Sequence, residues 1–200
     1  MFTAKLRILI IDANRIRASI IEEGLREAGL HDVIVVFETA EVMRRIVEID
    51  PDVVFIDLEN PSRDQLEYMF QVPRAIKRPV AMFVDSSDQQ STERAVQAGV
   101  SAYVVDGLKK ERVKTILDMA VSRFSAFDHL QRELETARTE LEDRKKIDKA
   151  KAILISTRKL TEPEAYALLR KTAMNQNRRI IDVAESLLMT SDLFDKEPEL

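Results

Sequence analysis

The first 120 residues alternate short apolar runs with amphipathic stretches. Runs rich in β-branched and aromatic side chains occupy residues 7–11, 33–37, 53–57, 80–84 and 102–105. Such runs are typical of strands buried on both faces. Between them, apolar residues recur at helical spacing over residues 16–28, 40–49, about 65–76 and 91–98. Strand–helix units in this order predict an α/β fold with a doubly wound, five-stranded parallel sheet.

The rest of the chain is predicted to be helical, beginning with one long helix. Gly107 is the last glycine, and no proline lies between Pro79 and Pro163. Because glycine and proline are the strongest helix breakers, the stretch 108–162 predicts a single helix.

Part of this helix carries the repeat of a coiled coil. Apolar positions step by three and four residues through Phe127, Leu130, Leu134, Ala137 and Leu141. A seam of about two heptads favours parallel homodimerisation, although it is short for an independent coiled coil. The alternative, that this face packs against the N-terminal domain of its own chain, stays open.

Two shorter helices are predicted after the long one. Thr161 and Glu164 form a capping box, with Pro163 in the first turn, which is a strong helix start. Apolar faces then lie on either side of the polar segment 175–177. Together with the end of the long helix, they predict a small all-α module of three helices.

The composition excludes several kinds of chemistry. The chain has no cysteine, two histidines and four glycines, and the glycines do not form a phosphate-binding pattern. Disulfides, thiolate metal sites and cysteine nucleophiles are therefore excluded, and we expect neither an enzyme nor a metalloprotein. No apolar run is long enough to cross a membrane, and we expect a cytoplasmic protein.

The net charge of −4 conceals a basic region. Residues 144–179 hold eleven Lys and Arg against three acids, a local charge of +8. Basic side chains bind nucleic-acid phosphates, and aromatic or Arg planes stack on unpaired bases. Charge alone does not separate this interpretation from a solvated helix surface with Tyr166 in the core. The candidate contacts are Lys149, Lys151, Tyr166, Arg170, Lys171, Arg178 and Arg179.

Acidic residues stand at the carboxyl ends of four of the predicted strands, and Asp85, after the run 80–84, is one of them. Asp12, Asp57 and Asp106 should share the sheet edge formed by the carboxyl ends of the strands, where ligands bind in such folds. The segments "ILIIDANR", "PDVVFIDLENP", "RPVAMFVD" and "AGVSAYVVDG" make residues 5–122 resemble the receiver domains of bacterial two-component response regulators. The resemblance places Asp57 at the position of the phosphoryl acceptor.

Three positions depart from the receiver pattern. The second acid after the first strand is Ala13, the Thr or Ser after the fourth strand is Val84, and the Lys after the fifth strand is Asp106. The resemblance therefore implies a degenerate pocket in which the like charges of Asp12 and Asp106 oppose phosphorylation of Asp57. It leaves at most weak Mg²⁺ binding at Asp12 and Asp57, and it favours signalling by protein contact.

The basic region carries a second resemblance. The segments "IDKAKAIL", "EAYALLRKTAM" and "NRRIIDVAESLL" make residues 137–191 similar to the ANTAR domain, an RNA-binding antiterminator module, with Ala152 where glycine is common. Receiver, coiled coil and ANTAR domain in this order resemble the AmiR/NasT family, and "KRPVAMFVD" resembles its NasT type. That resemblance implies control of nitrate and nitrite assimilation genes through paired hairpins in a leader RNA, with a nitrate-sensing partner protein that holds the regulator inactive.

The predicted domains follow from these segments. They are a degenerate receiver domain over 1–122, a coiled-coil linker helix over 123–143, an ANTAR domain over 137–191 and an acidic tail over 192–200. The predicted function is an RNA-binding transcription antiterminator that acts as a dimer. A DNA-binding response regulator and a protein-interaction adaptor without nucleic acid are the alternatives.

Overall fold

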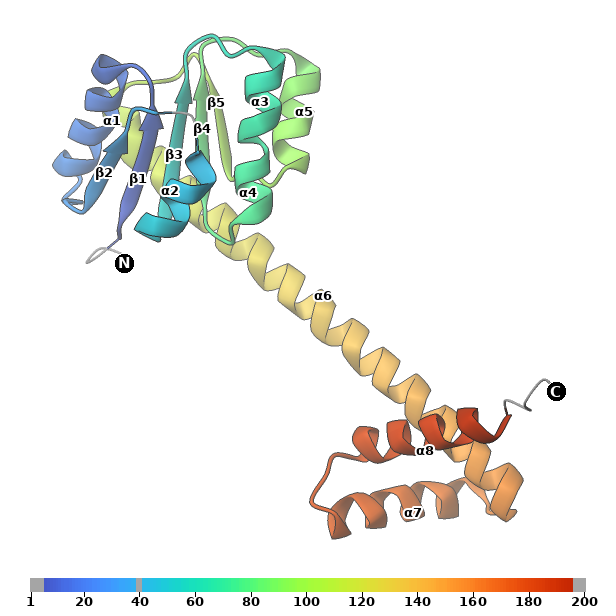
Figure 1. The fold of residues 1–200 in the computed structure, drawn as a ribbon. Coiled ribbons are helices and arrows are strands. Elements are labelled where there is room, and N and C mark those ends of the chain that lie inside the picture. The colour runs from blue at the N-terminus through green and yellow to red at the C-terminus, as the bar shows by residue number, and fades with distance from the viewer. Residues whose placement is uncertain (1–5, 39–40, 196–200) are drawn as a thin grey trace. The chain divides into compact units, whose positions relative to one another are not determined.

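The computed structural model describes residues 6–38 and 41–195 (Figure 1). The chain separates into two compact units, residues 1–129 and 130–200. The boundary lies within the long helix α6, Lys110–Arg158, which confirms the predicted glycine-free helix. Among the described residues, no helix is both long and apolar enough to span a membrane.

The first unit is built around a five-stranded sheet, as predicted. All neighbouring strands pair in parallel, in the order β2-β1-β3-β4-β5. At the carboxyl ends of β1 and β3, Asp12 lies in register with Asp57. The strands are β1 Ile8–Asp12, β2 Val33–Val36, β3 Val53–Leu58, β4 Val80–Val84 and β5 Ala102–Val105.

Helices cover both faces of this sheet (Figure 1). On one face, α1 and the first turns of α6 pack through residues such as Ile21 and Val113, while α2 to α5 cover the other. Full burial of each large apolar side chain stabilises the fold by about 1.5–3 kcal/mol. The helices are α1 Arg15–Glu27, α2 Val42–Ile49, α3 Arg63–Met69, α4 Gln71–Ala75 and α5 Gln89–Gln97.

The helix predicted over about 65–76 is two short helices, α3 and α4. Pro73 explains the break, because proline has no backbone N–H to donate to the carbonyl four residues earlier. The start of α3 is fixed by a capping box between Ser62 and Gln65. The prediction of one continuous helix was therefore wrong, and the chain turns after Met69 instead.

The second unit is a bundle of three helices, which confirms the predicted all-α module. The end of α6 packs with α7, Glu162–Asn175, and α8, Ile180–Asp195, around an apolar core that includes Ala150, Leu169 and Ala184. The predicted capping box at Thr161 and Glu164 is present. The predicted acidic tail over 192–200 begins inside α8, and 196–200 lie outside the described residues.

Two residues in the left-handed region of backbone space end the helices of this bundle. Lys159 has φ 52° directly after α6, and Asn177 has φ 49° after α7. Asparagine tolerates this conformation better than most residues, which agrees with the predicted interruption over 175–177.

The predicted heptad seam of α6 is exposed. The exposed fractions are 59% for Phe127, 62% for Leu130, 46% for Leu134 and 54% for Leu141. Large apolar side chains at a regular helical spacing are unusual on a surface without a partner.

Candidate functional site

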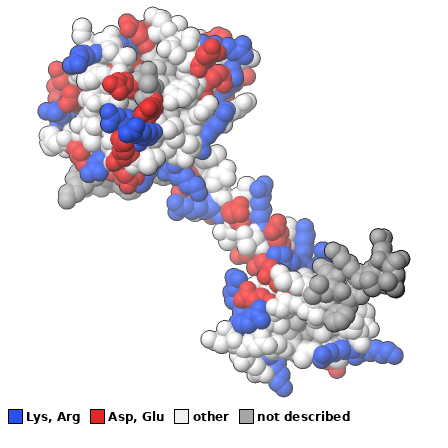
Figure 2. Space-filling model, viewed as in Figure 1, with Lys and Arg blue, Asp and Glu red and all other residues white. Residues whose placement is uncertain are grey.

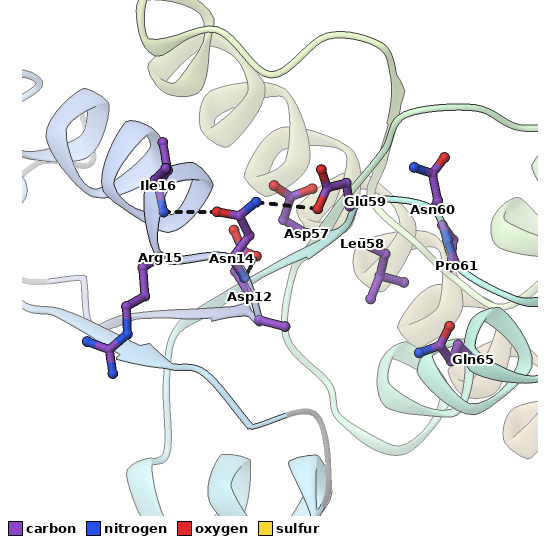
Figure 3. Close-up of a pocket in the computed structure, with 11 residues that line it drawn as sticks. Asp12, Asn14, Arg15, Ile16, Asp57, Leu58, Glu59, Asn60, Pro61 and Gln65 are labelled. Atoms are coloured by element: carbon purple, nitrogen blue, oxygen red, sulfur yellow. Dashed lines mark hydrogen bonds between the residues drawn. The ribbon is translucent and has the colours of Figure 1, made fainter.

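A pocket lies at the carboxyl ends of β1 and β3, and we refer to it as the strand-end pocket (Figure 3). Its volume is about 600 Å³. The side chain of Asn14 caps α1 by accepting a hydrogen bond from the Ile16 amide, and it donates another to Glu59. The lining residues come from the end of β1, the start of α1 and the segment from the end of β3 into α3: Asp12, Ala13, Asn14, Arg15, Ile16, Asp57, Leu58, Glu59, Asn60, Pro61 and Gln65.

Asp57 lies at this edge with its side chain fully buried, and Arg17 of α1 is its partner. The Nε and Nη2 atoms of Arg17 donate to the two carboxylate oxygens of Asp57 over 2.6 and 2.8 Å. Its Nη1 atom donates to Asp85, directly after β4, over 2.7 Å. The hydrogen bond with Asp57 is the main cause that raises the pKa of Arg17 above its usual value. The guanidinium therefore joins α1, β3 and the loop after β4.

Arg17 was missed by sequence reasoning. It occurs in a run of alternating charged and apolar residues that reads as an ordinary amphipathic helix start. Its position in the first turn of the helix after β1 is the only signal, since that turn lies at the edge where the strand-end acids gather.

Asp12 is the second buried acid of the pocket, with an exposed fraction of 3%. Its Oδ1 atom accepts a hydrogen bond from the Asn14 amide over 2.7 Å, and its Oδ2 atom has no partner among the described residues. The pKa of Asp12 is raised to about 7, mainly by burial and also by the charge of neighbouring Asp57, against the opposing effect of the hydrogen bond from the Asn14 amide. A buried carboxyl with an unpaired oxygen favours its protonated form.

The structure brings Asp12 and Asp57 together but leaves Asp106 apart from them. Asp106 is exposed, has φ 45°, and is not among the residues that line the pocket. Its amide donates to the carbonyl of Val84, which is itself buried. The acid that shares a cation with Asp57 is Asp85, which the sequence placed at this edge of the sheet without indicating its pairing with Arg17.

The pocket does not fit a divalent metal ion. Mg²⁺ takes hard oxygen ligands in a near-octahedral arrangement. Both oxygens of Asp57 already accept hydrogen bonds from Arg17, and Ala13 supplies no oxygen where a second acid would stand. Among the buried side-chain oxygens of the described residues, only Oδ2 of Asp12 has no hydrogen-bond partner. No step through a metal follows from this arrangement.

The second unit presents four of the seven predicted nucleic-acid contacts without a side-chain partner among the described residues. These side chains are exposed, and Tyr166 has an exposed fraction of 46% rather than a place in the core. Figure 2 shows Lys and Arg side chains projecting from the surface of this unit. The four residues are Lys149, Tyr166, Arg170 and Lys171.

The other three contacts are held within the unit. Lys151 forms ion pairs of 2.7 Å with both Asp148 and Glu162, which ties α6 to the start of α7. Arg178 donates to the carbonyl of Asp182 and to the hydroxyl of Ser186.

Arg179 is the third of these side chains. It pairs with Asp182 over 2.8 Å at the start of α8, and this carboxylate also accepts from the Arg179 amide. Lys151, Arg178 and Arg179 thus position the helices of the unit.

One face of α7 combines apolar and basic side chains. Tyr166, Arg170 and Met174 are spaced four residues apart and are all exposed, Met174 to 72%. Residues at this spacing lie on the same side of a helix. Sequence reasoning missed Met174, although its place one turn after Arg170 is visible in the sequence.

The fold of the first unit is that of a receiver domain, and comparison with known protein families agrees. Residues 8–118 match the response regulator receiver domain, and residues 135–188 match the ANTAR domain. The chain therefore belongs to the response regulator receiver family and carries an ANTAR domain, the combination found in antiterminator-type regulators. Both families are generally regulatory rather than enzymatic.

Individual relatives support the same class. The chain is 29% identical over 184 residues to the transcriptional regulatory protein PdtaR of Mycobacterium tuberculosis, covering 92% of this chain and 90% of that protein. It is 31% identical over 86 residues to the nitrate regulatory protein of Klebsiella oxytoca, covering 43% of this chain and 22% of that one.

Solved structures show the fold of the first unit. A CheY-like receiver domain protein from Methanospirillum hungatei superposes with a TM-score of 0.53 at 14% identity, covering 62% of this chain and 98% of that one. A response regulator from Thermotoga maritima gives a TM-score of 0.51 at 18% identity, covering 60% of this chain and 99% of that one.

Proposed function

We propose that the protein is a cytoplasmic RNA-binding transcription antiterminator. The observation that carries this proposal is the exposed set Lys149, Tyr166, Arg170 and Lys171 on the ANTAR domain. The charged groups of Lys149, Arg170 and Lys171 have no ion-pair partner among the described residues, so they are available to phosphates. Hairpin loops present unstacked bases, and a tyrosine or an arginine plane can stack on them.

The active form in this proposal is a homodimer joined by the heptad seam of α6. The seam is exposed in the single chain, and pairing it with a second copy would remove four large apolar side chains of each chain from water. Two ANTAR domains in one particle could then hold two hairpins of one leader RNA.

Control by a partner protein, rather than by phosphorylation, is the second part of the proposal. Arg17 already binds both oxygens of Asp57, and the residue at the end of β4 that would contact a phosphoryl group is Val84. A protein that covers the regulator until it senses its ligand would supply the switch instead. A relative named as a nitrate regulatory protein supports nitrate as the signal and nitrate and nitrite assimilation genes as the targets.

The test is RNA binding by the double variant Lys149→Ala/Arg170→Ala. RNA that co-purifies with the protein is sequenced, and affinity for it is measured at several salt concentrations. Loss of two phosphate contacts should weaken binding and lower the salt slope by about 1.4, at roughly 0.7 per contact on single-stranded RNA.

The matched control is Arg74→Ala/Lys77→Ala, which removes one Arg and one Lys from exposed positions of the receiver domain. It should leave both affinity and slope unchanged. An equal slope for the Lys149/Arg170 variant and the unaltered protein would refute the assignment of these residues. Displacement of the RNA by duplex DNA would favour the DNA-binding alternative, and absence of any bound nucleic acid would favour the adaptor.

A further inference from the structure

Three carboxylates, those of Asp12, Asp57 and Asp85, lie around the guanidinium of Arg17 beside the strand-end pocket. Asp57 and Asp12 line it, and Asp85 reaches the same guanidinium from the loop after β4. Among the described residues, Arg17 is the only basic residue that contacts any of these carboxylates. Its side chain is itself largely buried, with an exposed fraction of 18%.

We propose that Arg17 is the resident cation of this receiver domain and that it excludes divalent metal ions from Asp57. The inference goes beyond control by a partner protein, because it names the group that keeps divalent metal ions away from Asp57. It depends on the receiver domain alone, so its test involves no RNA and its failure would leave the RNA-binding proposal untouched.

The geometry favours the guanidinium over a metal ion. A planar guanidinium that donates two parallel hydrogen bonds to one carboxylate is among the strongest side-chain pairs, and burial strengthens it by lowering the local dielectric constant. The third donor of Arg17 is used by Asp85, so a metal ion at Asp57 would have to break two ion pairs. Truncating one partner of a buried charge pair is costly, because the other charge is left uncompensated.

Loss of Arg17 would leave an acidic site suited to a hard cation. Asp57 would regain two free oxygens, and the buried Oδ2 atom of Asp12, in the neighbouring strand at the same register, has no partner among the described residues. Oxygen ligands from carboxylates are those that Mg²⁺ and Mn²⁺ prefer. We therefore expect the Arg17→Ala variant to gain a divalent-cation site that the natural sequence lacks.

The experiment measures Mg²⁺ and Mn²⁺ binding to the full chain by calorimetry, together with the shift of the melting temperature at saturating metal. The unaltered protein should show no saturable binding in the millimolar range. Arg17→Ala should bind at least about tenfold more tightly, and its melting temperature should rise with metal. Adding Asp57→Asn to Arg17→Ala should abolish the gain.

Arg15→Ala is the matched control. Arg15 lies in the same turn of α1 and lines the same pocket, and its substitution removes the same charge. Its guanidinium, however, stacks over the ring of Phe37 at 4.5 Å and does not contact Asp57. The control should behave like the unaltered protein. Arg17→Gln, which removes the charge and keeps a hydrogen-bond donor, supplies the same comparison if the alanine variant does not fold.

Three results would overturn the proposal. The first is saturable metal binding by the unaltered protein that disappears with Asp57→Asn. The second is an equal gain of metal binding by Arg15→Ala, which would mean that the gain depends only on the net charge of the protein. The third is a folded Arg17 variant that binds no more metal than the unaltered protein.

Discussion

At the scale of single residues, the strand-end pocket holds two buried carboxyls with opposite environments. Asp57 is compensated by a bidentate guanidinium, whereas one oxygen of Asp12 has no partner among the described residues. The two acids lie in register on neighbouring strands, so ionising both places like charges side by side. Ionisation of Asp12 is therefore disfavoured, and its pKa is raised from 3.8 to about 7, mainly by burial.

Asp12→Asn should therefore stabilise the protein at alkaline pH. The folded state holds the Asp12 proton more tightly than the unfolded state, so the free energy of unfolding falls as pH rises from about 4 to 7. The asparagine variant carries no such charge and should gain a few kcal/mol at pH 8, at about 1.4 kcal/mol for each unit of pKa. At pH 4 the two proteins should be nearly equal.

Chemical unfolding at pH 4, 6 and 8 measures this difference. Asp64→Asn, an exposed acid in the first turn of α3, removes the same charge at the surface and serves as the control. If Asp12→Asn lowers the free energy of unfolding equally at all three pH values, the prediction is wrong. The Asp12 side chain would then be needed for packing or hydrogen bonding, and its charge would not destabilise the folded state.

The chemistry of the pocket could be predicted from sequence only in part. Asp12 and Asp57 follow apolar strands. Because the carboxyl ends of the strands in a parallel sheet share one edge, the sequence predicts that both acids lie at the same site. Asp106 follows a strand too, but its left-handed backbone turns the chain there and it remains exposed. Arg17 and Asp85 are 68 residues apart, and only the folded chain shows that they pair.

At the scale of elements, hydrophobic periodicity carried most of the prediction. Each strand begins and ends within about a residue of its apolar run. The central strands β1, β3 and β4 are buried throughout, and such strands must be apolar on both faces. The exception, α3 and α4, shows the limit of periodicity, since the helix breaks between Met69 and Gln71, just before Pro73, although the apolar spacing continues. Likewise, the sequence shows that Lys151 is basic but not that Asp148 and Glu162 engage it.

Substitutions in the seam of α6 should separate the proposed dimer into monomers. Leu130→Lys/Leu134→Lys places charges at the centre of the proposed contact, and both side chains are exposed in the single chain, so the fold of the monomer should persist. Each buried leucine contributes about 1.5–3 kcal/mol, and the dimer contains two copies of each. We expect the dimer dissociation constant to rise at least about a hundredfold.

Sedimentation equilibrium measures the change, and circular dichroism checks that the helices remain. Ser125→Lys/Thr139→Lys is the control, because it adds the same charges to exposed positions on the side of the helix opposite the seam. A monomeric unaltered protein at all concentrations would contradict the proposed dimer, as would a control as disruptive as the seam variant.

At the scale of the whole molecule, two matched domains in one chain define the class of regulator. The proposed function connects these domains, because a dimer formed through the exposed seam of α6 would carry two ANTAR domains. When one ANTAR domain has bound its hairpin, the second domain of a dimer faces the other hairpin at a high effective concentration. Such linkage strengthens binding by about 10²–10⁴ without any new contact, provided that the geometry permits both contacts at once.

The dimer should therefore prefer an RNA with two hairpins over the same RNA with one. Fluorescence anisotropy at protein concentrations above the dimer dissociation constant should show a preference of about a hundredfold or more. The Leu130→Lys/Leu134→Lys variant should lose the preference but keep its affinity for a single hairpin, because Lys149 and Arg170 are unaltered. An equal preference in the monomeric variant would mean that one ANTAR domain reads both hairpins and that the seam serves another purpose.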